Sequence, residues 1–508
     1  MNLSDSFYTQ VDSRPASQAL SLGETTLTYH ELAGRVAACQ YRLQAFLPVT
    51  LKTSNKDCRI AWHGPNSIAL VVLYLSCVRA GYTLVLLDPS WPESMRKRAL
   101  NFVSPQLLLD PDHAVFSIED GVVPDMDIPP SAEFGDAAYF LIGFTSGSSG
   151  SPKAFIRTQA SWIETFACAS SEFASEPGYR VLAPGPMSHG LTFYAMAETL
   201  NNGGHFLALP QFDVATVSRL LQSNNIHTLV VVPTMLVALL EHWNAPTYVG
   251  SLTRIISAGA KLSVAVRDAL AQRFPATELV EYYGASELSF VTVSQATETP
   301  PPESVGRAFC GVEICLRKAD GSPAGSADSG VVWVRSKMLA DGYLLEDGGV
   351  QQLADADGWA TVGDIGRFDE QGYLTLIDRA SNMLISGGLN VYPADVERVL
   401  EQHSAVAEAV VVGIPDDYWG ERICAFIRWH VVGSATAADS TDHSVSSVAS
   451  YCRAHLAPQQ RPAQFFALER WPLTHSGKID RQVLIKHLTG ADGTDDKQVL
   501  KIVKLADD

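Results

Sequence analysis

The chain contains few cysteines, and none of them are paired in the spacing that binds metals. It has 8 Cys in 508 residues and no Cys-x-x-Cys pair. The sequence therefore suggests no zinc site, and most of the cysteines stand in apolar surroundings, as buried thiols do. Reduced thiols are typical of the cytoplasm, where we expect this protein to be located.

Positive charge and long apolar segments are also scarce. There are 37 Lys and Arg against 55 Asp and Glu, which gives a formal net charge of −18. Nucleic acids and anionic membranes attract basic surfaces, so neither is expected as a main partner. The apolar run at 68–78 is too short to span a bilayer. The first residues lack a basic region followed by an apolar segment, so we expect no signal peptide.

The remaining composition is that of a globular enzyme with more than one domain. Hydrophobic residues make up 46% and charged residues 18% of the chain, and this length allows two or more large cores. Up to about residue 283, apolar strands alternate with amphipathic helices, a pattern that predicts a parallel sheet covered on both faces. From residue 305, short strands with Gly-rich turns predict an antiparallel β region.

We therefore predict an α/β fold with a large amino-terminal domain and a small carboxy-terminal one. The large domain, at 1–378, has parallel sheets with flanking helices plus the β region. Beyond Arg379 the alternation of helices and strands predicts an α+β domain of about 110 residues, which we place at 383–490. The polar tail, at 491–508, is expected to fray.

A loop rich in serine and glycine, at 144–153, is the first candidate for a binding site. It reads Phe-Thr-Ser-Gly-Ser-Ser-Gly-Ser-Pro-Lys and follows a short apolar strand. Flexible glycines, exposed N–H groups and a lysine are what a polyphosphate needs. Pro152 before the lysine distinguishes the loop from a Walker A sequence, and a Ser/Gly surface linker is the alternative interpretation. The candidate phosphate ligands are Thr145, Ser146, Gly147, Ser148, Ser149, Gly150 and Lys153.

Two further polar stretches follow predicted strands. They are Ser257-Ala-Gly-Ala260 and Tyr283-Gly-Ala-Ser-Glu287. Ligands of parallel α/β sheets bind beyond the carboxyl ends of the strands. Both stretches are therefore expected to face a ligand.

The Ser/Gly loop resembles the phosphate loop of the adenylate-forming enzymes. This superfamily includes acyl-CoA synthetases, peptide-synthetase adenylation domains and beetle luciferases. Four further stretches match in the family's order: Tyr283-Gly-Ala-Ser-Glu287, Gly358-Trp-Ala-Thr-Val-Gly-Asp364, Asp378-Arg379 followed by Ile385-Ser-Gly-Gly-Leu-Asn-Val-Tyr-Pro393, and Ser476-Gly-Lys-Ile-Asp-Arg481. The resemblance covers nearly the whole chain, which looks most like a stand-alone acyl-CoA synthetase.

The resemblance implies a two-step activation of a carboxylic acid. A carboxylate is a poor electrophile, and its mixed anhydride with AMP supplies a good leaving group. The first step uses ATP and Mg²⁺ to form acyl-AMP and release pyrophosphate, and it needs positioned cations where charge builds. In the second step, the acyl group passes to the thiol of coenzyme A. The alternative acceptor is the phosphopantetheine arm of a separate carrier protein.

The resemblance also implies roles for individual residues at the nucleotide site. Tyr283 packs against adenine, Ser286 binds the α-phosphate where the family usually has Thr, and Glu287 is the Mg²⁺ ligand. Asp364 accepts the ribose hydroxyls, and Arg379 adds a ribose or phosphate contact. A core tyrosine, a solvated glutamate and a surface ion pair are the respective alternatives for Tyr283, Glu287 and Arg379. Ser257, Gly259, Ala260, Tyr282 and Gly284 complete the expected nucleotide-binding set.

Lys478 is the implied catalytic lysine, which reaches from the small domain to the carboxylate and the nucleotide. The small domain pivots at 379–382 and then offers a tunnel for pantetheine past Gly387 and Gly388. The family commonly has Asp or Lys where this chain has Ser381, which leaves the hinge residue open.

The sequence says less about the acid. The family's amino-acid-activating members carry an Asp that binds the substrate ammonium, and this chain has His189-Gly190 at the aligned place. We therefore expect a fatty or aryl acid rather than an α-amino acid. His189 is a candidate catalytic residue that lines the acyl pocket, although a core histidine is an equal alternative. A catalytically silent nucleotide-binding protein is a third hypothesis, and the joint presence of Lys153, Glu287, Asp364 and Lys478 argues against it.

Overall fold

The computed structural model describes most of the chain. The described residues are 2–47, 58–116, 138–145, 153–173, 176–223, 225–243, 245–295, 300–318, 320–325, 328–379, 384–386, 389–416, 420–430, 444–474, 478–489 and 502–507. The chain divides into two compact units. The first comprises residues 1–317, 332–362 and 368–375, and the second 318–331, 363–367 and 376–508.

A nine-stranded sheet forms the centre of the first unit, in the order β14-β13-β12-β11-β10-β8-β9-β1-β2. Neighbouring strands from β1 to β12 along this order run parallel, and antiparallel pairs close both edges. The predicted parallel sheet is thus confirmed. The strands are β1 (Gln18–Leu22), β2 (Thr25–Thr28), β8 (Arg180–Leu182), β9 (His205–Ala208), β10 (Thr228–Val231), β11 (Arg254–Ala258), β12 (Glu278–Ala285), β13 (Ser289–Gln295) and β14 (Arg307–Ala308).

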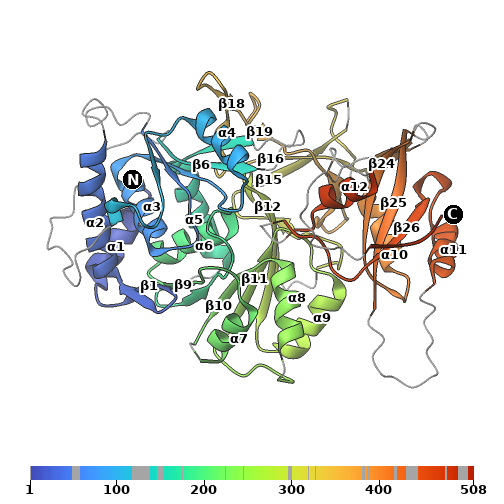
Figure 1. Ribbon diagram of the computed structural model, residues 1–508, viewed down its shortest axis with the longest axis horizontal. Coiled ribbons are helices and arrows are strands. Elements are labelled where there is room, and N and C mark those ends of the chain that lie inside the picture. Colours follow the sequence, from blue (N-terminus) through green and yellow to red (C-terminus); the bar gives the residue numbers. More distant parts are fainter. Residues whose placement is uncertain are drawn as a thin grey trace. The chain divides into compact units, whose positions relative to one another are not determined.

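Helices cover this sheet because their apolar faces can be buried only against it. Leu221, Leu236 and Leu270, from α7 (Val214–Ser223), α8 (Pro233–His242) and α9 (Val264–Arg273), share one buried cluster with Ile255 of β11. Figure 1 shows these helices beside β10 and β11. A second set, α5 (Gln159–Phe173) and α6 (Gly190–Asn201), packs through aromatic rings, with Trp162 and Tyr194 centroids 5.3 Å apart.

A seven-stranded sheet, in the order β18-β17-β7-β6-β4-β3-β5, completes the α/β part of the first unit. Its strands β5, β3, β4 and β6 are parallel, and β6 turns back into β7 as an antiparallel hairpin. The strands are β3 (Arg59–Trp62), β4 (Thr83–Leu86), β5 (Leu107–Leu109), β6 (Tyr139–Thr145), β7 (Lys153–Thr158), β17 (Gly342–Leu344) and β18 (Val350–Gln352). The helices before β6 are α1 (Asp5–Ser13), α2 (Tyr29–Phe46), α3 (Ile68–Ala80), α4 (Glu93–Val103) and the 3₁₀ turn Ala114–Phe116.

The predicted antiparallel β region is also present. It forms a sheet in the order β15-β16-β20-β21, with β19 paired to β16. The pairs of β16 with β19 and with β20 are antiparallel. Its strands are β15 (Glu313–Arg317), β16 (Gly330–Arg335), β19 (Trp359–Ala360), β20 (Asp364–Phe368) and β21 (Leu374–Arg379).

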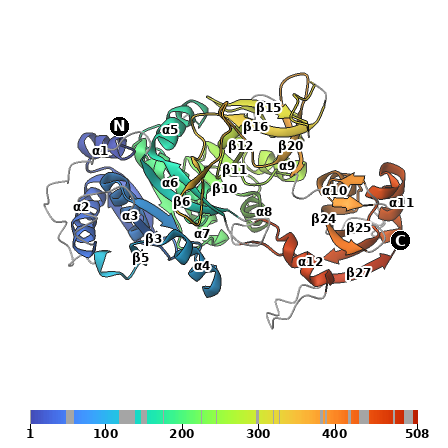
Figure 2. The ribbon, with the colours of Figure 1, turned by 90° about the horizontal axis from the view of Figure 1, so that it is seen from above.

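The carboxy-terminal part of the second unit is a sheet with helices on both faces. Strand β24 has a side-chain period of two: Val411 faces the cluster that contains Val396 and Val448, and Val412 faces the one with Leu484. In Figure 2, α10 and α11 lie on one side of β24 and β25, and α12 lies on another. The elements are β22 (Leu384–Ser386), β23 (Leu389–Val391), α10 (Pro393–Glu401), β24 (Val406–Asp416), β25 (Gly420–Trp429), α11 (Val445–His455), the 3₁₀ turn Pro458–Gln460, β26 (Gln464–Leu468), α12 (Arg481–Thr489) and β27 (Ile502–Asp507).

The prediction of a frayed tail is wrong for its last residues. Strand β27 pairs antiparallel with β26, from Gln464 opposite Asp507 to Leu468 opposite Ile502. The edge of β26 offers unpaired backbone groups, and a following segment can satisfy them whatever its composition. The predicted domain limits, with the hinge at 379–382, stay a prediction, and residues 380–383 lie outside the described part of the chain.

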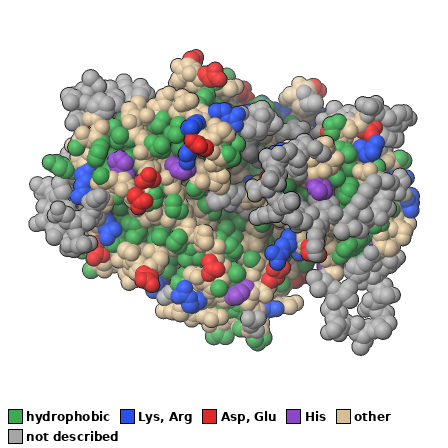
Figure 3. All heavy atoms as spheres, in the orientation of Figure 1, with side chains coloured by type: hydrophobic (Ala, Val, Ile, Leu, Met, Phe, Trp, Pro, Cys, Tyr) green, Lys and Arg blue, Asp and Glu red, His purple; other side chains and the backbone are tan. Residues whose placement is uncertain are grey.

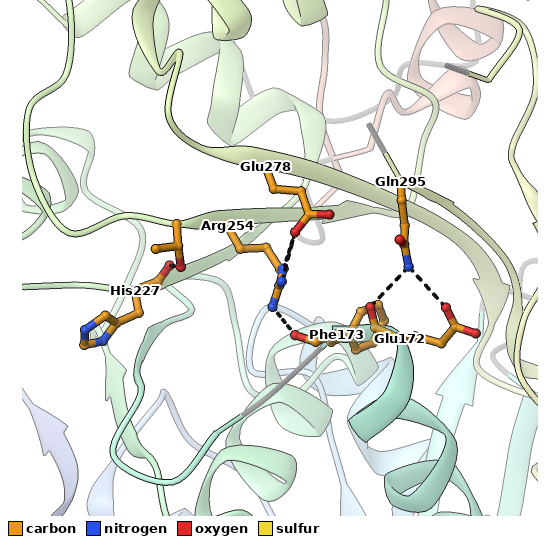
Figure 4. A network of polar contacts seen from close by, with 7 residues as sticks. Glu172, Phe173, His227, Arg254, Glu278 and Gln295 are labelled. Carbon is orange, nitrogen blue, oxygen red and sulfur yellow. Dashed lines mark hydrogen bonds and ion pairs between the residues drawn. The ribbon is translucent and has the colours of Figure 1, made fainter. Parts of the chain in front are cut away.

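An ion pair and several hydrogen bonds connect the carboxyl end of α5 to the nine-stranded sheet (Figure 4). The Arg254 guanidinium forms an ion pair of 2.9 Å with Glu278 and donates to the Phe173 carbonyl. The Gln295 amide donates to the carbonyl and the carboxylate of Glu172. On the face drawn in Figure 3, Lys and Arg side chains of the described residues lie in small separate groups. None of the described helices is long and apolar enough to span a membrane.

Candidate active site

The turn between β12 and β13 carries the candidate magnesium ligand. It is tight: a Cβ at Gly284 would lie 2.1 Å from the Ser289 carbonyl oxygen, and Ser289 has a left-handed φ of 62°. Only glycine fits against a backbone at that distance. The turn brings Ser286 and Glu287 to the carboxyl end of β12, where the parallel sheet presents its ligands.

Glu287 is a buried carboxylate, with 6% of its surface exposed. Thr145 Oγ1 donates to its Oε1 at 2.9 Å, and the Tyr343 hydroxyl donates to the same atom at 2.8 Å. Within the described part of the chain, Oε2 accepts no hydrogen bond. A buried carboxylate with one oxygen left over suits a hard cation such as Mg²⁺, which typically takes one or two protein carboxylates together with phosphate oxygens.

No fuller metal site competes with this one among the described residues. There, no three His, Cys, Asp or Glu side chains are grouped so that they could hold a metal ion by themselves. A single carboxylate is the usual protein contribution when a nucleotide supplies the other ligands. The donor set therefore fits a Mg²⁺ ion that arrives with ATP.

The ends of the predicted phosphate loop lie beside this carboxylate. Thr145, the last residue of β6, is paired with Lys153, the first of β7. The Lys153 ammonium is 5.4 Å from the centroid of the Tyr343 ring, whose hydroxyl binds Glu287. The loop residues between them, Ser146, Gly147, Ser148, Ser149 and Gly150, lie outside the described residues.

A buried arginine, Arg157 of β7, supports the same turn. Its side chain is 3% exposed and donates to the Ser286 carbonyl through Nη2 at 2.7 Å and Nε at 3.2 Å. It also donates to the Ser289 hydroxyl at 2.8 Å and the Met338 carbonyl at 2.9 Å. Burial lowers the pKa of Arg157 to about 10, partly offset by the charge of Glu287.

The candidate adenine-binding residues lie on two neighbouring strands. Ala258 of β11 is the parallel partner of Tyr282 of β12, so the 257–260 loop begins beside Tyr283. Ser257 is 1% exposed, and its hydroxyl has no hydrogen-bond partner among the described residues. Gly259 has a φ of 94° and is exposed, as is Ala260. Tyr283 is half-buried.

Tyr282 lies in an aromatic cluster of the core. Its ring centroid is 4.6 Å from that of Phe290 and 6.1 Å from that of Phe173. Alternate residues of a strand face opposite sides of the sheet. Tyr282 therefore packs against these rings, and Tyr283 is the tyrosine that faces away from them.

His189 is the N-cap residue of α6 and lies against a carboxylate. Its Nε2 is 3.4 Å from Oδ2 of Asp88, which follows β4. Burial would raise the pKa of Asp88, but hydrogen bonds from His189 and Ser90 lower it to about 2. Asn66 holds the segment that precedes this histidine, because its amide donates to the Gly185 carbonyl at 2.8 Å and accepts from the Met187 N–H at 2.6 Å.

The other predicted site residues belong to the second unit. Asp364, at the start of β20, is 5% exposed. Arg379 ends β21, and Gly387 and Gly388 lie outside the described residues. Lys478 has an exposed side chain, and its backbone N–H donates to Thr474 Oγ1 at 3.1 Å. These positions do not bear on their proposed roles, which stay predictions.

Three residues at the site were missed from sequence: Tyr343, Arg157 and Asp88. Arg157 could have been found, since a charged residue that ends the apolar run Ala-Phe-Ile of a strand is unusual unless it has partners. Nothing in the local sequence marks Tyr343. Its contact with Glu287 joins residues 56 positions apart through the pairing of β17 with β7.

Comparison with known families agrees with this geometry. The model of the AMP-binding enzyme family matches residues 7–344. This chain belongs to that family. The model of the AMP-binding enzyme C-terminal domain matches residues 395–478. The resemblance inferred from the five stretches is thus confirmed.

Two relatives and one solved structure illustrate the membership. The chain is 32% identical over 503 residues to an uncharacterized acyl-CoA ligase, YhfT, of Bacillus subtilis, covering 96% of this chain and 98% of the relative. It is 28% identical over 473 residues to the putative long chain fatty acid-CoA ligase VraA of Staphylococcus epidermidis, covering 93% and 95%. The fold matches that of ATP-bound MatB from Rhodopseudomonas palustris with a TM-score of 0.82, at 21% identity over 97% and 100% of the two chains.

Membership of this family confirms the expected enzyme class, an AMP-forming acid–thiol ligase that activates a carboxylic acid. The expected cofactors ATP, Mg²⁺ and coenzyme A are those of the family. A separate carrier protein as the acceptor is not favoured by relatives that are named acyl-CoA ligases.

Proposed function

We propose that this protein is an acyl-CoA synthetase for a fatty or aryl acid and that Glu287, Thr145 and Lys153 handle the phosphates of ATP. It joins the acid to AMP, releases pyrophosphate and passes the acyl group to coenzyme A. The observation that carries the proposal is the buried Glu287 carboxylate, bonded to Thr145 at the root of the Ser/Gly loop.

The roles divide according to charge. Lys153 and the N–H groups of the Ser/Gly loop would bind the β- and γ-phosphates, and Ser286 the α-phosphate. Glu287 would hold Mg²⁺, which neutralises charge on the leaving pyrophosphate when bound. Tyr283 would stack on adenine, with Ser257, Gly259, Ala260 and Gly284 around it. The Tyr282 ring, predicted to belong to this set, packs in the aromatic core instead.

Residues of the second unit would complete the reaction. Asp364 and Arg379 would bind the ribose, and Lys478 would place the attacking carboxylate near the α-phosphate. Gly387 and Gly388 would border the path of the pantetheine arm. Each of these roles follows from the matching family stretches, and the hinge at 379–382 would allow the two half-reactions to use different faces of the small domain.

His189, paired with Asp88, would face the acid, because it begins α6 after a strand of the parallel sheet. An apolar acid suits a site without the ammonium-binding Asp of amino-acid-activating relatives. Two named relatives support a fatty acid: the Staphylococcus epidermidis protein, and a medium/long-chain-fatty-acid–CoA ligase of Mycobacterium tuberculosis that is 31% identical over 365 residues. Most of the eight cysteines are buried, as the thiols of cytoplasmic proteins typically are, and this supports the cytoplasm as the location.

The test is mass spectrometry of reactions with ATP, Mg²⁺ and a panel of fatty, aryl and short-chain acids, each with and without coenzyme A. We expect acyl-CoA from one class of fatty or aryl acid. Acyl-AMP that accumulates unchanged by coenzyme A would contradict the acceptor and point to a carrier protein. Absence of both products with every acid would overturn the proposed function.

A further inference from the structure

Arg157 is a buried cation that forms no ion pair within the described residues. Its side chain is 3% exposed and has five donors to satisfy. Burying an unpaired charge is strongly unfavourable unless hydrogen bonds replace those that the charge made to water. A hydrophobic side chain could be buried at this position of β7 without the desolvation of a charge, so packing alone does not explain the arginine.

Three of the hydrogen bonds that Arg157 donates converge on the 286–289 segment, and the others go to Ser161 and Met338. Two of the three reach the Ser286 carbonyl, which belongs to the peptide group that leads into Glu287. Another reaches the Ser289 hydroxyl, which itself donates to the Met338 carbonyl at 2.7 Å. Ser289 is held in the left-handed region at a φ of 62°, a strained conformation that needs support from the surrounding structure.

Glu287 itself is held by contacts from two other segments of the chain. Thr145 of β6 donates to the Glu287 carboxylate, and the Ala340 N–H donates to the Glu287 carbonyl at 2.7 Å. Thr145 and Arg157 lie on the two strands that flank the Ser/Gly loop, and those strands are paired. The Glu287 charge partly offsets the effect of burial on the pKa of Arg157, so the two charges attract across the turn.

We propose that Arg157 is a positioning residue that fixes the 286–289 turn so that Glu287 is oriented for Mg²⁺ before ATP arrives. This inference rests on the proposed function, in which Glu287 is the metal ligand. Fixed orientation lowers the cost of assembling the nucleotide–metal complex. Arg157 links that turn to β7, which is paired with β6, and these two strands flank the Ser/Gly loop.

The test uses the full-length chain with the variants R157M and R157K, and R254M as a matched control. Arg254 is a less completely buried arginine that likewise donates to a carbonyl, but it lies in the α5 network of Figure 4. Calorimetry would measure ATP binding without acid or coenzyme A at increasing Mg²⁺. Because hydrogen bonds to a charged group contribute about 1.5–3 kcal/mol, R157M should need about tenfold more Mg²⁺ for half-maximal ATP binding.

The second measurement needs no ligand. Amide hydrogen exchange of residues 283–290 in the absence of Mg²⁺ should be about tenfold faster in R157M and unchanged in R254M. R157K should fall between wild type and R157M, because one ammonium keeps the charge without the planar donor geometry. If R157M and R254M shift the Mg²⁺ requirement equally, or R157M leaves it unchanged, the positioning role is wrong.

Two further results, a variant that does not fold and a wild type that does not bind ATP, are distinguished as follows. If R157M does not fold, Ser289→Ala removes the hydroxyl between Arg157 and Met338 and should raise the Mg²⁺ requirement about threefold; an unchanged requirement would overturn the inference. If wild-type protein shows no Mg²⁺-dependent ATP binding, the proposed function itself fails. Normal wild-type binding with an unaffected Arg157 variant refutes only the role of Arg157.

Discussion

At the level of single residues, the burial of a charged side chain indicates the site better than the residue type alone. A lone glutamate in a sequence is usually a solvated surface charge, yet Glu287 is 6% exposed and accepts two hydroxyl donors. Arg157 is 3% exposed and donates three hydrogen bonds to the same turn. Both side chains are shielded from water and hydrogen-bonded to protein groups in fixed positions, as a preorganised phosphate site requires.

Lys478 gives the sharpest test at the residue scale. Because the proposed role of its ammonium is to place the carboxylate in the first step, Lys478→Ala should reduce acyl-AMP formation by about 100-fold or more. Thiol attack on supplied acyl-AMP should be largely spared. Pyrophosphate exchange and single-turnover thioester formation measure the two steps separately. An equal loss in both would show that Lys478 does not have this role.

At the scale of elements, the hairpins decide the geometry of the site. The β6–β7 hairpin contains the Ser/Gly loop, and the β12–β13 hairpin presents Glu287. Neither β7 nor β13 was predicted, because each follows a polar stretch. Each pairs with the preceding strand as a hairpin and with a later strand, β17 or β14, on its other edge. Strand pairs of this kind are stabilised across the sheet rather than along the sequence.

Gly284→Ala tests the close approach within the β12–β13 hairpin. A Cβ there would lie 2.1 Å from the Ser289 carbonyl oxygen, so the backbone must move. We expect a loss of about 1–3 kcal/mol in the free energy of unfolding and weaker Mg²⁺-dependent ATP binding. Denaturant unfolding and calorimetry would measure both. Gly372→Ala is a control that has room for the Cβ but a positive φ of 82°; it should leave ATP binding unchanged.

Removal of β27 tests the unexpected pairing at the end of the chain. A chain that ends at Thr489 would leave one edge of β26 unpaired. Amide exchange at residues 464–468 should become about tenfold faster, since each lost backbone hydrogen bond contributes about 0.5–1.5 kcal/mol. Exchange in the nine-stranded sheet serves as the internal control. Unchanged protection of β26 would mean that β27 adds nothing to its stability.

At the scale of the whole molecule, one buried histidine makes stability depend on pH. Burial, reinforced by Arg180, lowers the pKa of His205 from 6.5 to about 4, and its Nε2 lies 2.8 Å from the Ser21 hydroxyl. Between these values the unfolded chain binds a proton that the folded chain does not, so stability rises with pH over this window and is lost as pH falls through it.

This dependence can be measured with His205→Gln, which keeps a polar group but removes the titration. Between pH 7 and 5 the wild type should lose about 2 kcal/mol of unfolding free energy from this group, and the variant should lose correspondingly less. Urea unfolding at the two pH values gives the difference. Exposed His30→Gln is the control for removing an imidazole. Equal pH slopes in wild type and His205→Gln would contradict the assignment.

The sequence by itself determined the family, the enzyme class and the alternation of strands and helices. It did so because local signals suffice there: hydrophobic periodicity, helix ends and five short stretches in a fixed order. The parallel sheet was predicted from apolar strands that alternate with helices, and strands β8 to β12 are parallel, whereas their order in the sheet was not predicted. The polar stretch with Glu287 was correctly expected at a strand end.

The tertiary structure alone decided which side chains meet. Tyr343 reaches Glu287 only because β17 pairs with β7. Asp88, which follows β4, contacts His189 only because the fold brings the end of β4 next to the N-cap of α6. The pairing of β27 with β26 likewise depends on an edge that the tail's composition does not reveal. Such contacts join residues far apart in the chain, and their energies depend on burial and geometry that arise only once the sheets have formed.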